Sequence, residues 1–180
     1  MIRKSLVLAA LVAATGSQFA NAADGTINFT GSLTDTTCTI TVGGSVSPSV
    51  AAVKLPSSTA AKLAKAGDVD GQTGFNVELS ACAGTATTAA AIFASGGNVD
   101  PVSGNLKNTG TASNVMLQLL DSTSGKAIKA GDASQMTSTS RVNLNADGTT
   151  VLPYAVQYFA TGAATAGTVI SAVTYSVDYQ

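Results

Sequence analysis

Two cysteines carry the most definite chemistry in this sequence of 180 residues. Cys38 and Cys82 form an even pair, and in an oxidising compartment such a pair most simply forms a disulfide. Because the chain has no histidine, the two cysteines cannot complete a usual zinc site, and their separation is unlike a CxxC redox pair. Closing the loop between them would stabilise the fold by about 4 kcal/mol in the chain-entropy treatment.

The other side chains offer little catalytic chemistry. Without histidine, Ser-His-Asp and Cys-His nucleophile pairs and most transition-metal sites are excluded. Asp68 and Asp70 could act as an acid–base pair, but they border a glycine-containing loop and are interpreted as solvated turn residues. The glycines of GGSVSPS and GTASN lack the strand–GxxxxGKS–helix context of a phosphate loop. We therefore predict neither an enzyme nor a cofactor.

Residues 1–22 have the pattern of a secretion signal. Arg3 and Lys4 give a positive start, Leu6–Ala14 is apolar but too short to span a bilayer, and Ala20-Asn21-Ala22 is a small-x-small cleavage site. A buried N-terminal helix is the alternative, but it does not account for these three features in this order. We therefore predict that the protein is exported.

Cleavage at that site would leave 158 of the 180 residues, a length that fits one domain with a sizeable core. Seven basic and ten acidic side chains would remain, because two basic residues leave with the signal, and the basic ones form no cluster. Binding a polyanion requires lysine and arginine gathered on one face, so nucleic acid is not a predicted partner. No further apolar run reaches the length that spans a membrane.

Alternating apolar residues predict a series of short β-strands. Phe75, Val77 and Leu79 alternate with polar residues, whereas Val115–Leu120 is apolar on both sides and is predicted to be covered on both faces. Other strands are predicted at Thr39–Val42, Ala89–Ala94, Arg141–Leu144, Tyr154–Ala160 and Val169–Tyr179. Turns are predicted at Gly43-Gly44, Gly96-Gly97, Ser124-Gly125, Asp147-Gly148 and Gly162.

Short strands, frequent turns and one long-range disulfide indicate an antiparallel β-sandwich of immunoglobulin-like type. The one helix-like segment is Ser58–Ala66, where Ser57 or Ser58 could cap a short helix that Gly67 ends. The sequence shows no internal repeat and no domain boundary within the exported part.

Apolar alternation also marks both ends of the exported chain. At the start, one face of the stretch Gly25–Cys38 carries Ile27, Phe29, Gly31 and Leu33. At the end, one face carries Val173, Tyr175, Val177 and Tyr179. Proteins normally hide unpaired strand edges. Two possibilities stay open on the pattern alone: the two strands pair within one chain, or each pairs with another molecule.

Five stretches together resemble the major pilins of type 1-like fimbriae, which the chaperone–usher route assembles. They are GTINFTGSLTDTTCTI around the first cysteine, GFNVELSAC around the second, NVMLQLLD, LPYAVQYFATGAATAG, and the ending YSVDYQ with Tyr179 next to last. Each stretch is modest alone, but five in this order are specific. The resemblance covers essentially all of the exported sequence.

The resemblance implies an all-β fold, namely an incomplete immunoglobulin-like antiparallel sandwich that lacks its last strand. In such pilins a periplasmic chaperone temporarily fills the resulting hydrophobic groove, and the N-terminal extension of the next subunit then replaces it. Residues 23–34 would be this donor-strand extension and residues 35–180 the pilin domain. The donor residues would be Ile27, Phe29, Gly31 and Leu33, and the residues that line or border the groove would be Val173, Tyr175, Val177 and Tyr179.

On this resemblance we expect a structural, non-enzymatic rod subunit that polymerises by donor-strand exchange in an adhesive surface pilus. Its partners would be identical or related pilins, a periplasmic chaperone and an outer-membrane usher, with no nucleic acid and no small-molecule substrate. It would pass through the periplasm to a fimbria at the cell surface. A minor adaptor or terminator pilin is the alternative within the family. A secreted immunoglobulin-like sugar-binding module is another, weakened by the absence of tryptophan, and the lack of histidine disfavours a secreted hydrolase.

Overall fold

The computed structural model describes residues 35–48 and 50–180, which fold as two antiparallel sheets. The large sheet has the order β2-β1-β3-β9-β6-β5, with β7 also paired to β6, and the small sheet has the order β10-β4-β8. The strands of the large sheet are β1 Thr37–Val42, β2 Ser45–Val46, β3 Val69–Ala83, β5 Leu106–Lys107, β6 Val115–Asp121, β7 Ala127–Ile128 and β9 Thr150–Ala160. Those of the small sheet are β4 Thr88–Phe93, β8 Val142–Asn143 and β10 Tyr175–Tyr179.

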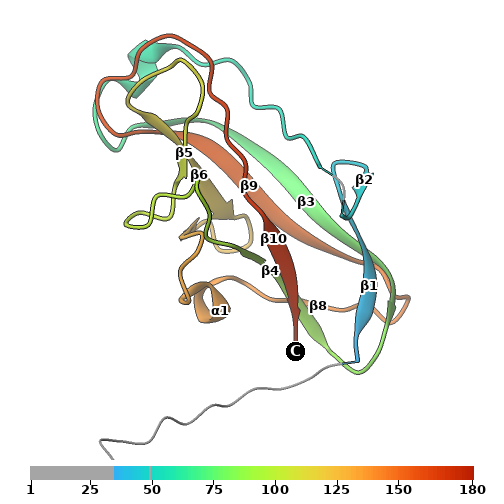
Figure 1. Ribbon diagram of the computed structural model, residues 1–180. Coiled ribbons are helices and arrows are strands. Elements are labelled where there is room, and N and C mark those ends of the chain that lie inside the picture. Colours follow the sequence, from blue (N-terminus) through green and yellow to red (C-terminus); the bar gives the residue numbers. More distant parts are fainter. Residues whose placement is uncertain (1–34, 49) are drawn as a thin grey trace, which may run out of the picture. The chain divides into compact units, whose positions relative to one another are not determined.

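The two sheets pack face to face, with β10 and β4 lying over the long strands β3 and β9 (Figure 1). Side chains alternate between the faces of a strand, so every second residue enters the space between the sheets. Leu79 of β3, Leu152 of β9 and Phe93 of β4 are each at most 2% exposed there. The rings of Phe93 and Tyr154 meet edge to face at 5.3 Å between centroids and join the two layers.

The predicted strands correspond to β1, β3, β4, β6, β8 and β9, although β3 and β9 are longer than predicted. The strand predicted at Val169–Tyr179 is wrong in its extent, because only its last five residues form β10. Earlier in this stretch, the Ile170 C=O instead accepts a hydrogen bond from the backbone N–H of Thr109, in the loop after β5. β6 is buried on its inner face, but Met116 and Gln118 on the other face are only partly buried.

The helix predicted at Ser58–Ala66 is also wrong in its extent and its cap. Only Ala60–Leu63 is helical, as the 3₁₀ turn η1, and its N-cap Thr59 makes no side-chain cap hydrogen bond. The hydroxyl of Ser58 donates instead to Asp70 at 2.6 Å, and so does not cap the turn. Asp70 lies in β3 rather than in a turn, and the hydrogen bonds from Ser58 and Lys62 hold the pKa of its carboxyl below the usual range. The patterns did not predict α1 Gln135–Ser138 or the two-residue strands β2, β5 and β7.

A buried carboxylate ends β6. Asp121 is 2% exposed and accepts hydrogen bonds from the Thr123 and Ser140 backbone N–H groups, both at 2.9 Å, and from the Ser124 hydroxyl at 2.7 Å. Burial by itself would raise the pKa of this carboxyl, but the hydrogen bonds from Ser140, Ser124 and Thr123 hold it below its ordinary value. The ionised group thus joins the β6–β7 turn to the segment after α1.

We expect Asp121→Asn to lower the free energy of unfolding at pH 7 by about 1 to 2 kcal/mol, because an amide cannot accept all three hydrogen bonds. Since the folded-state pKa is depressed, the wild-type carboxylate stabilises the protein above about pH 4 and loses its effect as pH falls through the folded value. Urea unfolding should therefore separate wild type from variant at pH 7, by a difference that shrinks progressively as pH is lowered below about 4. Asp147→Asn, in an exposed turn, serves as the control and should change stability less. Equal stability of Asp121→Asn and wild type at pH 7 would contradict this role.

Candidate functional site

The cysteines are joined, as predicted, by a Cys38–Cys82 disulfide. The bridge links β1 to β3 within the large sheet rather than one sheet to the other. The β1–β3 register shifts between Thr37 and Thr39, and Ala81 on the facing strand has a φ of 50°. This irregularity is a β-bulge, which brings the two Cα atoms within 4.1 Å of each other. The disulfide therefore anchors the start of β1 to the longest strand of the fold.

β10 is an edge strand with a defined set of outward backbone groups. Thr88 and Gln180 exchange backbone hydrogen bonds in both directions, and the Ala94 N–H donates to Thr174. In an antiparallel ladder such bonded pairs alternate with non-bonded ones, so the N–H and C=O groups of Tyr175, Val177 and Tyr179 point away from β4. Among the described strands, β10 pairs with β4 alone. Its outer edge is therefore free to accept a strand.

The side chains that belong to this open edge are only partly buried. Tyr175, Val177 and Tyr179 face the core, yet none is as enclosed as Phe93 on the neighbouring strand. The same is true of Val169 and Val173 in the segment that leads into β10. Burial of the Tyr179 ring nevertheless raises the pKa of its phenol. Apolar residues that contact the core but keep part of their surface in water indicate that the sandwich lacks cover along this side.

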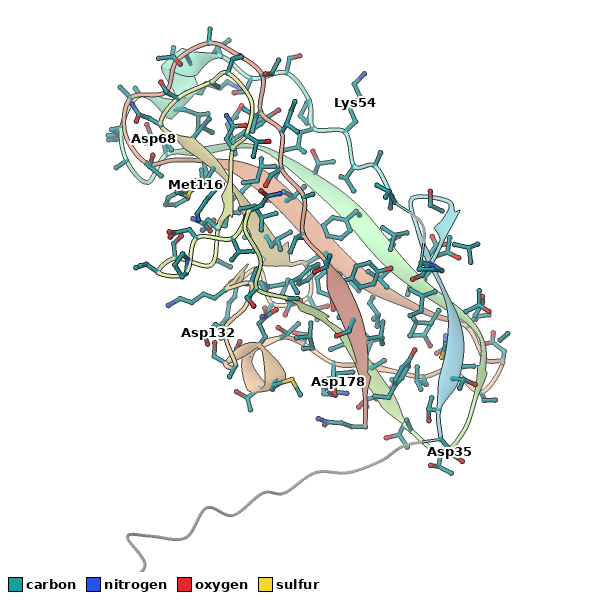
Figure 2. The ribbon with its side chains drawn as sticks, viewed as in Figure 1. Asp35, Lys54, Asp68, Met116, Asp132 and Asp178 are labelled. Carbon is teal, nitrogen blue, oxygen red and sulfur yellow. A yellow bond between two sulfur atoms is a disulfide. The ribbon has the colours of Figure 1, made fainter. Side chains whose placement is uncertain are left out.

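A second set of partly buried residues contacts the same core from the other end of the chain. Ala51, Val53 and Leu55 pack against it, whereas the residues between them are exposed, and Figure 2 shows Lys54 pointing away from the molecule. This stretch has the alternation of a strand but belongs to no described ladder. The first residues of β1 likewise have no described strand on the side away from β3, because β2 pairs only with Thr41 and Val42. Two incomplete edges thus border one apolar core.

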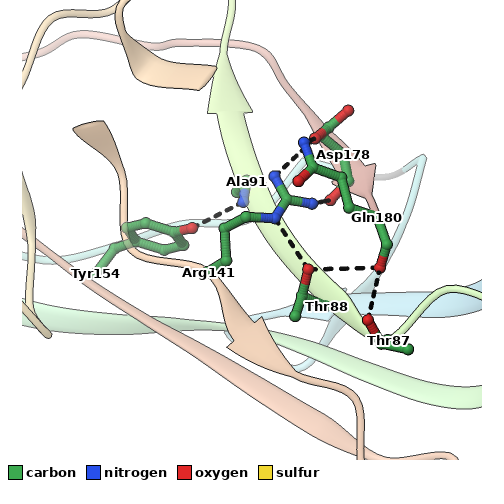
Figure 3. Close-up of polar contacts among 7 residues, drawn as sticks. All are labelled: Thr87, Thr88, Ala91, Arg141, Tyr154, Asp178 and Gln180. Carbon is green, nitrogen blue, oxygen red and sulfur yellow. Dashed lines mark hydrogen bonds and ion pairs between the residues drawn. The ribbon is translucent and has the colours of Figure 1, made fainter. Parts of the chain in front are cut away.

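The opposite edge of the small sheet is closed. β8 covers the start of β4, and beyond it the Tyr154 hydroxyl accepts from the Ala91 N–H at 2.7 Å (Figure 3). The Gln135 side chain accepts from the Phe93 N–H and donates to its C=O, both at 3.0 Å, as a neighbouring strand would. Gln135 is 2% exposed. Side chains therefore complete one edge of this sheet, while no strand in the described part of the chain pairs with the other edge.

Comparison with known proteins places this geometry in a family. The family described as "Type-1 fimbrial protein, A" matches residues 55–180. The F17 fimbrial protein of Escherichia coli is 40% identical over 99% of this chain and 100% of its own length. The major fimbrial subunit SMF-1 of Stenotrophomonas maltophilia is 42% identical over 89% of this chain and 95% of its own. The chain belongs to the type-1 fimbrial protein family.

This fimbrial protein also shares its fold with a solved pilin. The crystal structure of the P pilus rod subunit PapA superposes with a TM-score of 0.55, at 17% identity, over 79% of this chain and 99% of PapA. The fold is an incomplete immunoglobulin-like sandwich, as predicted. As a fimbrial structural subunit at the cell surface, the protein is also non-enzymatic, as expected. In the described part of the chain, no helix is long and apolar enough to cross a membrane, and no cluster of three metal-ligating residues occurs.

The structure brings together some of the residues that the sequence singled out. Tyr175, Val177 and Tyr179 share the open edge of the pilin, with Val173 directly before them. The predicted donor residues Ile27, Phe29, Gly31 and Leu33, the signal segment and the whole of the extension 23–34 lie outside the described residues. Sequence reasoning did not predict that Ala51, Val53 and Leu55 pack against the core. The alternation in AAVKLP was the available signal, weakened by low-complexity surroundings.

Proposed function

We propose that this fimbrial subunit is the repeated rod pilin and that it polymerises by donor-strand exchange. The observation that carries the proposal is the open edge of β10, whose outward backbone groups lie beside a row of partly buried apolar side chains. Such an edge is suited to β-augmentation, in which main-chain hydrogen bonds provide affinity and alternate side chains enter the core. Its exposure calls for an occupant, because unpaired edges otherwise cause uncontrolled aggregation.

The occupant in this proposal is residues 23–34 of a second copy of the chain. That stretch alternates Ile27, Phe29, Gly31 and Leu33 with polar residues, which matches an edge with one apolar side. Burial of its three large side chains would contribute about 5 to 8 kcal/mol, at about 1.5 to 3 kcal/mol each. Gly31 would meet a shallow part of the acceptor edge, as its counterpart does in the pilins that the sequence resembles.

The same arrangement accounts for a filament. A donated strand can leave only when the fold around it opens, so dissociation is slow and the contact is kinetically stable. Because each subunit gives one strand and receives another, the interface is heterologous and does not close on itself. Before assembly, a periplasmic chaperone would cover the open edge, and an outer-membrane usher would order the exchange.

The acceptor edge is tested by placing a charge on it. Val177→Lys puts an ammonium group where the incoming strand must pack, and burial of an unpaired charge is strongly unfavourable. We expect heat-resistant multimers to fall by about tenfold or more, which corresponds to only about 1.4 kcal/mol. Ser176→Lys is the matched control, since its side chain lies on the opposite face of the same strand and is exposed.

Both variants should lack free thiols, which shows that the Cys38–Cys82 bridge has formed and the subunit has folded. Wild-type multimer yield from folded Val177→Lys would refute the acceptor edge.

Electron microscopy of cells whose only fimbrial subunit of this type is the wild-type chain tests whether the protein is the rod subunit or a minor subunit. Long fibres built mainly of this chain support the rod assignment, and fibres that contain it only at an end contradict it.

A further inference from the structure

We propose that Arg141 is a positioning residue that holds β10 in place while its outer edge is unpaired; this rests on the proposed function of that edge. Arg141 directly precedes β8, on the far side of β4 from β10. Its guanidinium nevertheless reaches across β4 and contacts β10, as Figure 3 shows. One side chain thus connects all three strands of the small sheet.

The Arg141 guanidinium donates two hydrogen bonds to β10 and one to β4. Nη1 donates to the Asp178 carboxylate at 2.7 Å and Nη2 to the Asp178 backbone C=O at 2.9 Å. Nε donates to the Thr88 hydroxyl of β4 at 3.0 Å. Only arginine presents donors in this rigid planar arrangement. The side chains of Arg141 and Asp178 are 17% and 29% exposed, so water screens this ion pair less than a surface pair.

The register of the sheet explains how the side chain crosses β4. Ala89 pairs with Val142, so Ala90 comes opposite Arg141, and Ala90 also pairs with Asp178 on its other side. The three residues therefore form one row on the outer face of the small sheet. Ala90 is 1% exposed although it lies on that outer face, consistent with the arginine stem covering it. A small residue in the middle of the row leaves room for the guanidinium to pass.

The position of this contact suits a strand with a single neighbour. β10 has five residues, pairs with β4 alone among the described strands, and offers its other edge to a donor. Without a second neighbour, such a strand is prone to local opening. Arg141 opposes that opening, because it hydrogen-bonds to both the backbone C=O and the side chain of Asp178 from the β8 side of the sheet. Once a donor strand pairs with β10, the strand is held from both sides, and the contribution of Arg141 to its protection becomes small.

Hydrogen–deuterium exchange of the exported full chain tests this in two states, the isolated monomer and the assembled multimer. The reporters are the Ser176 and Asp178 amides, which face β4, and the β9 amides serve as an internal reference. In monomers of Arg141→Gln we expect exchange at β10 to rise by about tenfold, for the loss of charge-assisted hydrogen bonds, with β9 unchanged. Arg141→Lys keeps the charge but not the planar set of donors, so its β10 exchange should lie between those of the wild type and Arg141→Gln. In multimers, the β10 difference should fall below about twofold.

Lys62→Gln is the matched control, because it removes one charge from an exposed ion pair with Asp70. Lys62 lies in η1, which is not part of the small sheet. This variant should leave β10 exchange at the wild-type value. Unchanged β10 exchange in Arg141→Gln monomers, an equal rise in β9, or an undiminished difference in multimers would each overturn the positioning role. If wild type forms no multimers at all, the proposed function fails, yet the monomer comparison still decides whether Arg141 holds β10.

Discussion

A chain that lacks residues 23–34 is expected to fold, to form its disulfide and to stop fibre growth completely. The described fold from residue 35 onward contains both sheets, the disulfide and the open β10 edge, so the deletion leaves the acceptor intact. It removes the alternating stretch that would fill the edge of the neighbouring subunit. Electron microscopy and multimer analysis on gels without heating measure the effect. Fibres of normal length from this truncation would contradict the donor assignment.

Mixing two defective chains tests separately which chain donates the strand and which one accepts it. On the proposed mechanism, the truncated chain should accept a strand but not give one, whereas Val177→Lys should give a strand but accept one at least about tenfold less well. Together they should form a one-to-one complex that extends no further, because each heterologous contact uses one donor and one acceptor. Each variant by itself should remain largely monomeric. Long multimers in the mixture would show that subunits associate through another surface.

Cys38→Ser is expected to give the largest loss of stability in the described fold. The disulfide closes a loop with a sequence separation of 44 residues, and its removal should cost about 4 kcal/mol in the chain-entropy treatment. That is a large share of the stability of an ordinary domain, so the yield of folded subunit should fall sharply. Yield in the periplasm and the midpoint of urea unfolding measure the change.

The double variant Cys38→Ser/Cys82→Ser is the control for side reactions of the remaining thiol. Equal destabilisation of the single and double variants assigns the loss to the bridge itself, since no free Cys82 is then available to form mixed disulfides. Because the bridge ties β1 to β3, a weakened bridge should also loosen one border of the acceptor edge. Wild-type yield and unfolding midpoint in the double variant would contradict a stabilising role.

Much of the fold followed from local patterns. The apolar runs bounded by turn residues predicted β4 and β6 to within one residue at each end, because short runs of this kind favour buried strands. Period-two alternation failed over residues 169–173, where apolar alternation continues but the Ile170 C=O bonds to the loop after β5 instead of to a strand. Side-chain periodicity reports which residues face the core, and it does not report which backbone groups are paired. The same limitation explains the helix prediction, where the Ser58 hydroxyl bonded to Asp70, a residue distant in sequence.

The sequence by itself determined the fold class, the cysteine pair, the absence of histidine chemistry and the apolar face of the last strand, since each depends on residue type and local spacing. Only the tertiary structure decided that β10 pairs with β4 alone among the described strands, that Gln135 and Tyr154 close the opposite edge of the sheet, and that Arg141 reaches Asp178 across β4. These features depend on strand order and register, which bring distant residues into one row. Period-two patterns are the same whichever neighbour a strand has, so no local pattern could have specified them.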